Sequence, residues 1–96
     1  MQKKQCIELI RQNLPYIQTE FGVEGICLFG STARGDNKVG SDVDLLIDMP
    51  PKIFLISRLK DYLENLLNTS VDIIRRHANL SQKFINEITL DGIILL

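Results

Sequence analysis

The segment 28–44 restricts the possible folds of this chain more than any other part. A segment at 23–29, whose last four residues form a continuous apolar run, ends at Gly30-Ser31. Ten residues then separate Ser31 from Asp42-Val43-Asp44, which begins a second strand-like segment. Alternate side chains of an extended strand point to opposite faces, so Asp42 and Asp44 share one face. The pattern predicts a buried strand, then a glycine-rich loop, then a strand that carries two carboxylates on one face.

Periodicity predicts the other elements. Apolar residues at three- and four-residue steps indicate helices, and short β-branched runs indicate strands. Pro15 lacks a backbone donor, so we expect either a break near Asn13 or a new short helix with Pro15 in its first turn. The predicted order is a helix at 6–17, a strand at 23–29, a loop at 30–40 with one helical turn around 32–34, a strand at 42–48, a helix at 53–67, a strand at 71–74, a helix within 80–88, and a tail at 93–96 that forms an edge strand or a contact surface. This order indicates an α/β (α+β) fold around a small sheet.

The composition limits the size and class of the protein. Ninety-six residues suffice for one domain, 1–96, and 45% hydrophobic with 24% charged residues is typical of a globular protein. A formal charge of −1 disfavours direct binding of nucleic acid. No signal-peptide core or membrane-spanning apolar run is present, so we expect a cytoplasmic location. Cys6 and Cys27 have apolar neighbours and are expected to pack in the core.

The candidate site combines a Gly-Ser pair with three aspartates. At the end of a strand, Gly30 lets backbone amides approach a phosphate closely, and Ser31 adds a hydroxyl donor. The paired carboxylates of Asp42 and Asp44 can hold two Mg²⁺ ions, which prefer oxygen ligands and share them with substrate phosphates. Asp72 lies in the next predicted strand, where a carboxylate among apolar residues is costly to bury without a partner. These residues predict a two-metal site for a nucleoside triphosphate.

The same residues resemble the Gly-Ser…Asp-x-Asp pattern of the DNA polymerase β-like nucleotidyltransferase superfamily. Residues 28–35 and 41–47 are specifically similar to its minimal nucleotidyltransferase (MNT) branch, and the similarity continues into 71–74. The resemblance implies a short mixed sheet flanked by helices and Mg²⁺-dependent transfer of AMP from ATP. It also implies catalytic and metal-binding roles for three residues and nucleotide-binding roles for four: Asp42, Asp44 and Asp72, and Gly30, Ser31, Arg34 and Ser41.

The resemblance further implies a protein partner. Single-domain MNT proteins are similar to antitoxins that pair with HEPN-domain toxins, which are ribonucleases, and that transfer AMP to a tyrosine near the toxin's active site. The chain would then act as a hetero-oligomer with such a toxin, which supplies the acceptor hydroxyl. Two alternatives remain open: a non-catalytic antitoxin that masks the toxin by binding, and a nucleotidyltransferase that modifies a small-molecule hydroxyl.

Other polar residues have simpler interpretations. Residues 30–35 lack the Lys-Ser/Thr ending of a phosphate-binding P-loop, which excludes that class of site. Asp36 is expected in solvent, and Asp48 lies roughly 13 Å along the strand from Asp44. His77 has no sequence partner for a catalytic triad and is expected in an exposed loop. Arg75 and Arg76 would contact a nucleotide or an acidic partner, or remain surface charges.

Overall fold

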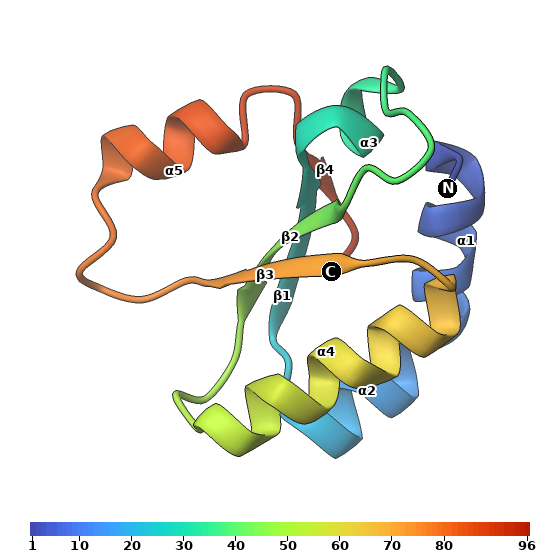
Figure 1. Ribbon diagram of the computed structural model, residues 1–96. Coiled ribbons are helices and arrows are strands. Elements are labelled where there is room, and N and C mark those ends of the chain that lie inside the picture. Colours follow the sequence, from blue (N-terminus) through green and yellow to red (C-terminus); the bar gives the residue numbers. More distant parts are fainter.

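A four-stranded sheet runs through the centre of the computed structural model, which describes residues 1–96 (Figure 1). Five helices surround it. The bounds of the elements in chain order are α1 Lys3–Gln12, α2 Leu14–Phe21, β1 Gly25–Phe29, α3 Gly30–Arg34, β2 Val43–Asp48, α4 Ile53–Leu67, β3 Val71–Arg75, α5 Gln82–Ile88 and β4 Ile93–Ile94.

The sheet has the strand order β3-β2-β1-β4 and is mixed. Strands β1 and β2 pair antiparallel, β2 and β3 pair parallel, and β4 adds antiparallel to the outer edge of β1. The parallel pair is possible because α4 carries the chain back along the sheet between β2 and β3, as a crossover helix does. The small mixed sheet with flanking helices confirms the predicted fold class.

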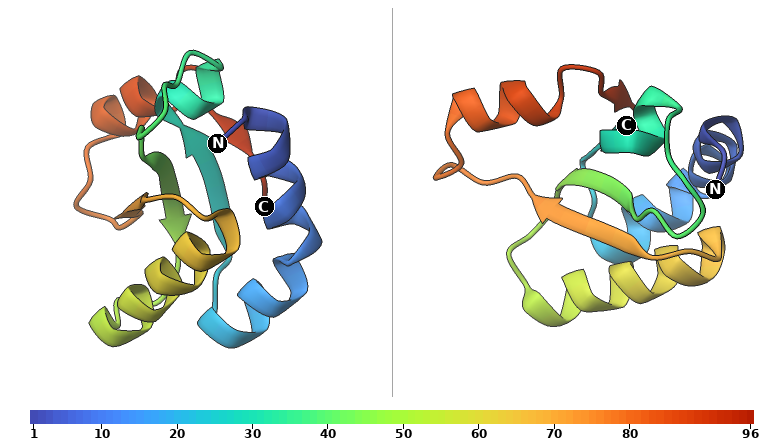
Figure 2. Two further views of the ribbon diagram at one scale, coloured as in Figure 1. Left: turned by 45° about the vertical axis from the view of Figure 1, so that its right-hand side comes forward. Right: turned by 45° about the horizontal axis from the view of Figure 1, so that its top comes forward.

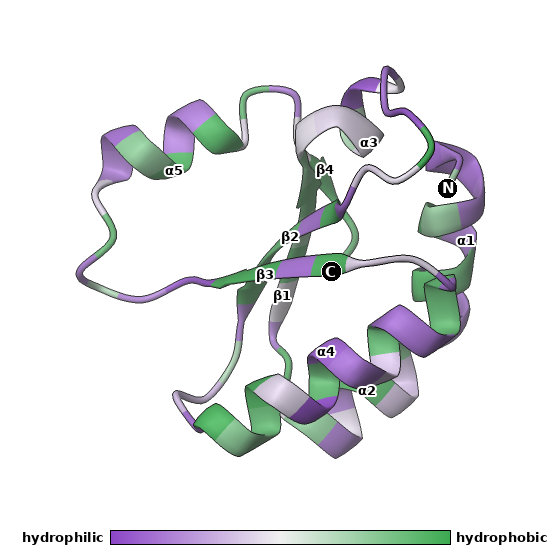
Figure 3. Ribbon diagram, viewed as in Figure 1, coloured by the Kyte–Doolittle hydropathy of each residue, from purple (hydrophilic) through white to green (hydrophobic).

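The two faces of the sheet are covered unequally (Figures 1 and 2). Helices α1, α2 and α4 pack on one face and enclose a core of 17 buried residues, which includes Val43, Leu45 and Ile47 from β2. On the other face a smaller cluster joins Cys27, Phe29 and Leu46 to Ile85, the one buried residue of α5. Figure 3 shows mostly hydrophobic strands interrupted by hydrophilic segments, and helices that carry both kinds of residue. The face that α5 shares is therefore the more accessible of the two.

The N-terminal helical region divides as the proline predicts. Helix α1 ends before Asn13, whose side-chain amide donates to the carbonyl of Leu9 at 2.7 Å. Pro15 lies in the first turn of α2, where a missing N–H leaves no hydrogen bond unmade. Gly22 then ends α2 in the left-handed conformation with φ 65°. The structure thus contains both features that were predicted as alternatives, the break near Asn13 and a new short helix with Pro15 in its first turn.

Several element boundaries differ from the sequence prediction. The N-terminal helices cover Lys3–Gln12 and Leu14–Phe21 rather than 6–17, and β3 continues to Arg75 rather than ending at 74. Strand β1 begins at Gly25 rather than at 23. Helix α3 begins at Gly30, directly after β1, whereas a turn around 32–34 was expected within a loop. Asp42 precedes β2, which starts at Val43. Helix α4 has the predicted bounds, and the tail forms the edge strand β4.

Two further expectations from the sequence concern the cysteines and membrane-spanning segments. Cys6 and Cys27 are both buried as free thiols, as their apolar neighbours predict. Burial raises the pKa of the Cys6 thiol to about 11, because a thiolate would lose its hydration there. No helix of the structure is both long and apolar enough to cross a lipid bilayer.

Candidate active site

Strand pairing brings two of the three predicted carboxylates side by side. Asp44 of β2 is the direct register partner of Asp72 in β3, and on its other side it is paired with Phe29 of β1. Neighbouring strands lie about 4.8 Å apart, and side chains at partnered positions point to the same face. Asp42 stands two residues before Asp44, exposed at the point where the loop enters β2. The three aspartates therefore collect at one end of the more accessible sheet face.

Gly30 lies against the central carboxylate. It adopts φ 75°, and a Cβ atom added there would be only 3.2 Å from Cγ of Asp44 and closer still to one carboxylate oxygen. A side chain at position 30 is thus disfavoured both by the backbone conformation and by Asp44. The absence of a side chain lets the backbone at the β1–α3 junction lie against the Asp44 carboxyl group, and the predicted approach of this backbone to a phosphate remains a prediction.

Burial and neighbouring negative charges both act on the carboxyl group of Asp44. Burial raises the pKa of Asp44 above its ordinary value, and the neighbouring carboxylates of Asp72 and Asp42 raise this pKa further. Arg34 is the one nearby cation that lowers the pKa of Asp44. The ion pairs of the structure join Arg34 to Asp36 and Arg58 to Glu20, so no cation is paired with any of the three site aspartates.

The donor set suits a hard divalent cation. Three neighbouring carboxylates without a cationic partner offer the oxygen ligands that Mg²⁺ prefers, and a cation would relieve their mutual repulsion. As the side chains stand, no three acidic, histidine or cysteine groups lie close enough together to hold a single ion. Asp42 and Asp72 are exposed, so a change of rotamer could turn either carboxylate toward Asp44 without disturbing the core. The metal-binding role of these residues remains a prediction that their chemistry fits.

The three remaining predicted residues, Ser31, Arg34 and Ser41, lie in α3 and in the loop before Asp42. Ser31 lies half-buried in the first turn of α3, next to Gly30. Arg34 occupies the last turn of α3 and pairs with Asp36 at 3.2 Å, so Asp36 is exposed but not merely solvated. Ser41 accepts a hydrogen bond from the backbone N–H of Lys38 at 3.0 Å and so orders the loop before Asp42. The Ser41 side chain therefore makes its hydrogen bond within its own loop.

Residues with simpler interpretations lie where the sequence places them. Asp48 is exposed at the far end of β2. His77 is exposed in the loop after β3, where its Nδ1 accepts the backbone N–H of Asn79 at 3.2 Å. The side chain of Arg75 donates to the carbonyls of Met49 and Arg76, which holds the β2–α4 connection against β3.

One residue near the site, Thr32, was not recognised in the sequence. Thr32 is fully buried in α3, and its hydroxyl has no hydrogen-bond partner. A helix that starts at Gly30 places Thr32 on its inner side. Arg76, which was expected to contact a nucleotide or an acidic partner or to remain a surface charge, reaches the sheet face of the aspartates, because it follows Asp72 by four residues and its N–H continues the β3 ladder to Ile47.

Comparison with known proteins agrees with this geometry. The model of the nucleotidyltransferase domain family matches residues 10–96. A protein of Methanocaldococcus jannaschii, MJ1215, provisionally named a protein adenylyltransferase, is 36% identical over 73 residues, which cover 74% of this chain and 85% of the relative. The protein adenylyltransferase MntA of Thermococcus cleftensis is 40% identical over 64 residues, 65% of each chain.

Solved structures share the architecture. A chain provisionally described as a minimal nucleotidyltransferase superposes with a TM-score of 0.77 and 27% identity, covering 97% of this chain and 95% of that one. The MNT antitoxin of Shewanella oneidensis, solved with its tri-AMPylated HEPN toxin, superposes with a TM-score of 0.57 and 21% identity over 98% of this chain and 68% of that one, which shows a common fold. The sequence match over residues 10–96 and the shared sheet lead to one conclusion: the chain belongs to the nucleotidyltransferase domain family, among the minimal nucleotidyltransferases related to MntA.

Proposed function

We propose that this chain is an antitoxin that transfers AMP from ATP to a tyrosine hydroxyl of a HEPN-domain ribonuclease toxin and thereby inactivates the toxin. The observation that carries the proposal is the pairing of Asp44 with Asp72 next to Gly30, with Asp42 beside them and no cation paired to any of the three. The names of the relatives, protein adenylyltransferases, support the same activity.

In this proposal each site residue has a separate task. The three carboxylates would hold two Mg²⁺ ions, which when bound neutralise phosphate charge and activate a hydroxyl. The backbone at Gly30 and the hydroxyl of Ser31 would hold the phosphates of ATP, with Arg34 and Ser41 as further contacts. The tyrosine oxygen would form a bond to the α-phosphorus while the bond from that phosphorus to the pyrophosphate oxygen breaks. The hydroxyl proton would pass to Asp72 or to solvent, and pyrophosphate would leave.

The position of the chain's own tyrosines supports an acceptor on another molecule. Tyr16 and Tyr62 stack with Phe21 between α2 and α4, with ring centroids 5.1 to 6.0 Å apart. This aromatic cluster lies with the helices on the opposite face of the sheet from Asp44 and Asp72. Neither hydroxyl lies on the face of the carboxylates, which supports a nucleophile supplied by another molecule.

Labelling tests the proposal. ATP labelled at the α-phosphate, Mg²⁺ and a HEPN-domain protein from the same genome are incubated with the chain, and label on the HEPN protein is measured. Asp44→Asn and Asp72→Asn should each lower the rate by about 100-fold or more, since a lost metal contact removes several kcal/mol of transition-state stabilisation. Asp61→Asn, a solvent-exposed change on α4, should keep the wild-type rate.

The same variants separate catalysis from binding. If cells that carry the toxin survive equally well with Asp44→Asn and with the wild type, neutralisation works by masking alone, and the enzymatic account of it is wrong. If no label reaches the HEPN protein but a small hydroxyl compound is modified, the acceptor class is wrong.

A further inference from the structure

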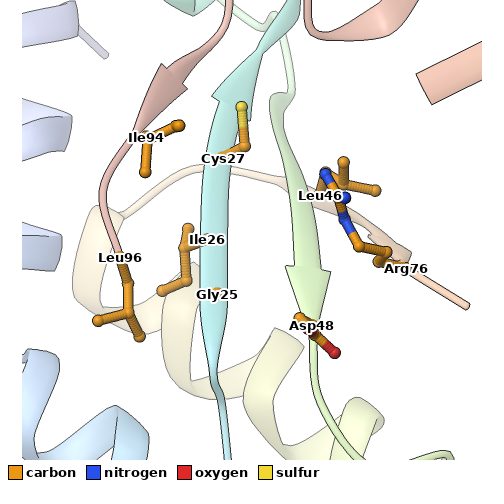
Figure 4. A pocket seen from close by; sticks show the side chains of 8 residues that line it. All are labelled: Gly25, Ile26, Cys27, Leu46, Asp48, Arg76, Ile94 and Leu96. Atoms are coloured by element: carbon orange, nitrogen blue, oxygen red, sulfur yellow. The ribbon is translucent and has the colours of Figure 1, made fainter. Parts of the chain in front are cut away.

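A pocket opens on the sheet face that carries the aspartates, toward the other end of the strands. It has a volume of about 180 Å³, and Figure 4 shows Leu46 and Arg76 together on one flank with Ile94 on the other. Cys27 and Leu46 form part of an apolar floor, while Asp48 and Arg76 add one charge of each sign. The Ile94 side chain is 73% exposed, which is unusual for a large apolar residue within a sheet.

The pocket lies on the same sheet face as the candidate active site, although Asp42, Asp44 and Asp72 do not line it. Leu46 follows Asp44 by two residues on β2, and Arg76, whose N–H continues the ladder one residue past the end of β3, follows Asp72 by four residues, so all four side chains belong to one face. A two-residue step along a strand is about 6.6 Å. A protein segment that places a hydroxyl at Asp44 and Asp72 would therefore lie within one side-chain length of the pocket.

Helix α5 covers part of this face and leaves Ile94 and Arg76 exposed. Its one buried residue, Ile85, packs against Cys27, Phe29 and Leu46, so Leu46 is only 2% exposed, and no α5 residue lines the pocket. The opposite face is closed by three helices. The guanidinium of Arg76 belongs to neither ion pair of the structure, and Asp48 lines the same pocket. The accessible part of the pocket is thus its rim, which offers an exposed apolar side chain and a positive charge outside any ion pair.

We infer that this pocket is the docking site of the acceptor protein, an inference that rests on the proposed function. The occupant is an apolar side chain of the acceptor that packs on Ile94 at the rim of the pocket, with a carboxylate of the same protein paired to Arg76. The pocket fixes the acceptor on the sheet face so that its hydroxyl reaches Asp44 and Asp72. A few such buried contacts supply most of the affinity of a protein interface.

Binding measurements with two ligands test the inference. The dissociation constant of the HEPN-domain protein and that of a non-hydrolysable ATP analogue with Mg²⁺ are measured by calorimetry for each variant. Ile94→Glu and Arg76→Glu should each weaken HEPN binding about tenfold or more, since one lost anchor costs on the order of 1 kcal/mol or more, and should raise KM for this acceptor with kcat unchanged. ATP-analogue binding should stay at the wild-type value.

Two controls isolate the pocket. Val39→Glu makes the same kind of change at an exposed apolar residue beside the N-terminus, away from the pocket, and should leave HEPN binding unchanged. Ile94→Leu keeps the apolar contact and should bind the HEPN protein like the wild type.

Each other outcome has a defined meaning. Unchanged HEPN binding in both glutamate variants overturns the docking site, and so does a parallel loss of ATP-analogue binding, which would assign the pocket to the nucleotide or to folding. No binding of the HEPN protein by the wild type also overturns it. Wild-type binding that depends on Ile94 but transfers no label leaves the docking site standing and rejects the proposed function alone.

Discussion

At the scale of single residues, Gly30 lies directly against the carboxyl group of Asp44. Position 30 combines φ 75° with a space that Asp44 fills, so two separate restrictions act on one residue. Gly40 has φ 88°, but a Cβ there would meet nothing within 4 Å. The chain thus contains a matched pair of left-handed glycines, one inside the site and one outside it.

Gly30→Ala should therefore lower both stability and AMP transfer, whereas Gly40→Ala should lower stability alone. The left-handed conformation costs a residue with a Cβ about 1–2 kcal/mol, which both variants incur. Only at position 30 does the new methyl displace the Asp44 carboxylate, and we expect at least a tenfold lower transfer rate there. Thermal unfolding and labelling of the acceptor measure the two effects. Equal transfer rates in the two variants would show that the contact with Asp44 has no catalytic role.

In the absence of Mg²⁺, the ionised carboxylate of Asp44 should lower the free energy of unfolding of the chain. Its pKa is raised in the folded state by burial and by Asp72 and Asp42, so the folded chain disfavours the ionised form relative to the unfolded chain. The contribution of protonated Asp44 to folding stability is fully present below the unfolded-state pKa of about 3.9, and it is lost as the pH rises through the folded-state pKa. Asp44→Asn should then melt above the wild type at pH 7 with a chelator present, and the difference should shrink toward pH 4. A wild type that is more stable than Asp44→Asn at pH 7 without metal would contradict this account.

At the scale of elements, α5 is the part most weakly joined to the rest. It has seven residues and one buried side chain, and its start is held by Ser81, whose Oγ accepts the backbone N–H of Phe84 at 3.1 Å. A short helix depends strongly on such a cap, because few tertiary contacts replace the lost hydrogen bond.

Ser81→Ala should destabilise α5 locally by about 1 kcal/mol, the usual cost of a lost N-cap. Amide hydrogen exchange should become faster in α5 while α4 and the strands keep their protection. Ser57→Ala, at an exposed position within α4, is the control and should change neither region. Faster exchange throughout the chain would mean that α5 and the sheet unfold as one unit.

The same scale shows which elements the sequence could predict. The apolar spacing of 53–67 is sufficient to define α4, and its bounds are confirmed. The start of α3 at Gly30 was missed because a five-residue helix has too few apolar positions for a periodic pattern. Glycine and serine composition there indicates a loop equally well, and only the tight turn out of β1 makes the helix begin at once.

At the scale of the whole molecule, the sheet separates the aromatic cluster from the carboxylates. Tyr16 and Tyr62 pack between α2 and α4 on one face, and Asp44 and Asp72 point to the other. The chain's own two tyrosines therefore lie on the face away from the carboxylates, where their rings contribute to packing.

The chain should accordingly not label itself in dilute solution. Tyr16→Phe/Tyr62→Phe should transfer AMP to the acceptor at the wild-type rate, within about twofold, because both rings keep their stacking without a hydroxyl. Mass spectrometry of the wild type after incubation with ATP and Mg²⁺ should find no AMP on either tyrosine. Stoichiometric self-modification at Tyr16, whose side chain is partly exposed, would refute the separation of acceptor and catalyst.

The sequence by itself determined the types of nearly all elements and the alternation that puts Asp44 on the face opposite Val43 and Leu45, and it predicted Asp42 and Asp72 as further acids of the site. These follow from local spacing, which depends only on the period of a helix or a strand. The tertiary structure alone decided the strand order and directions, and through them the register that places Asp72 beside Asp44 and opens the pocket between Leu46, Arg76 and Ile94. Strand pairing joins residues distant in sequence, and it depends on how the buried faces of all the helices and strands pack together, which no local pattern contains.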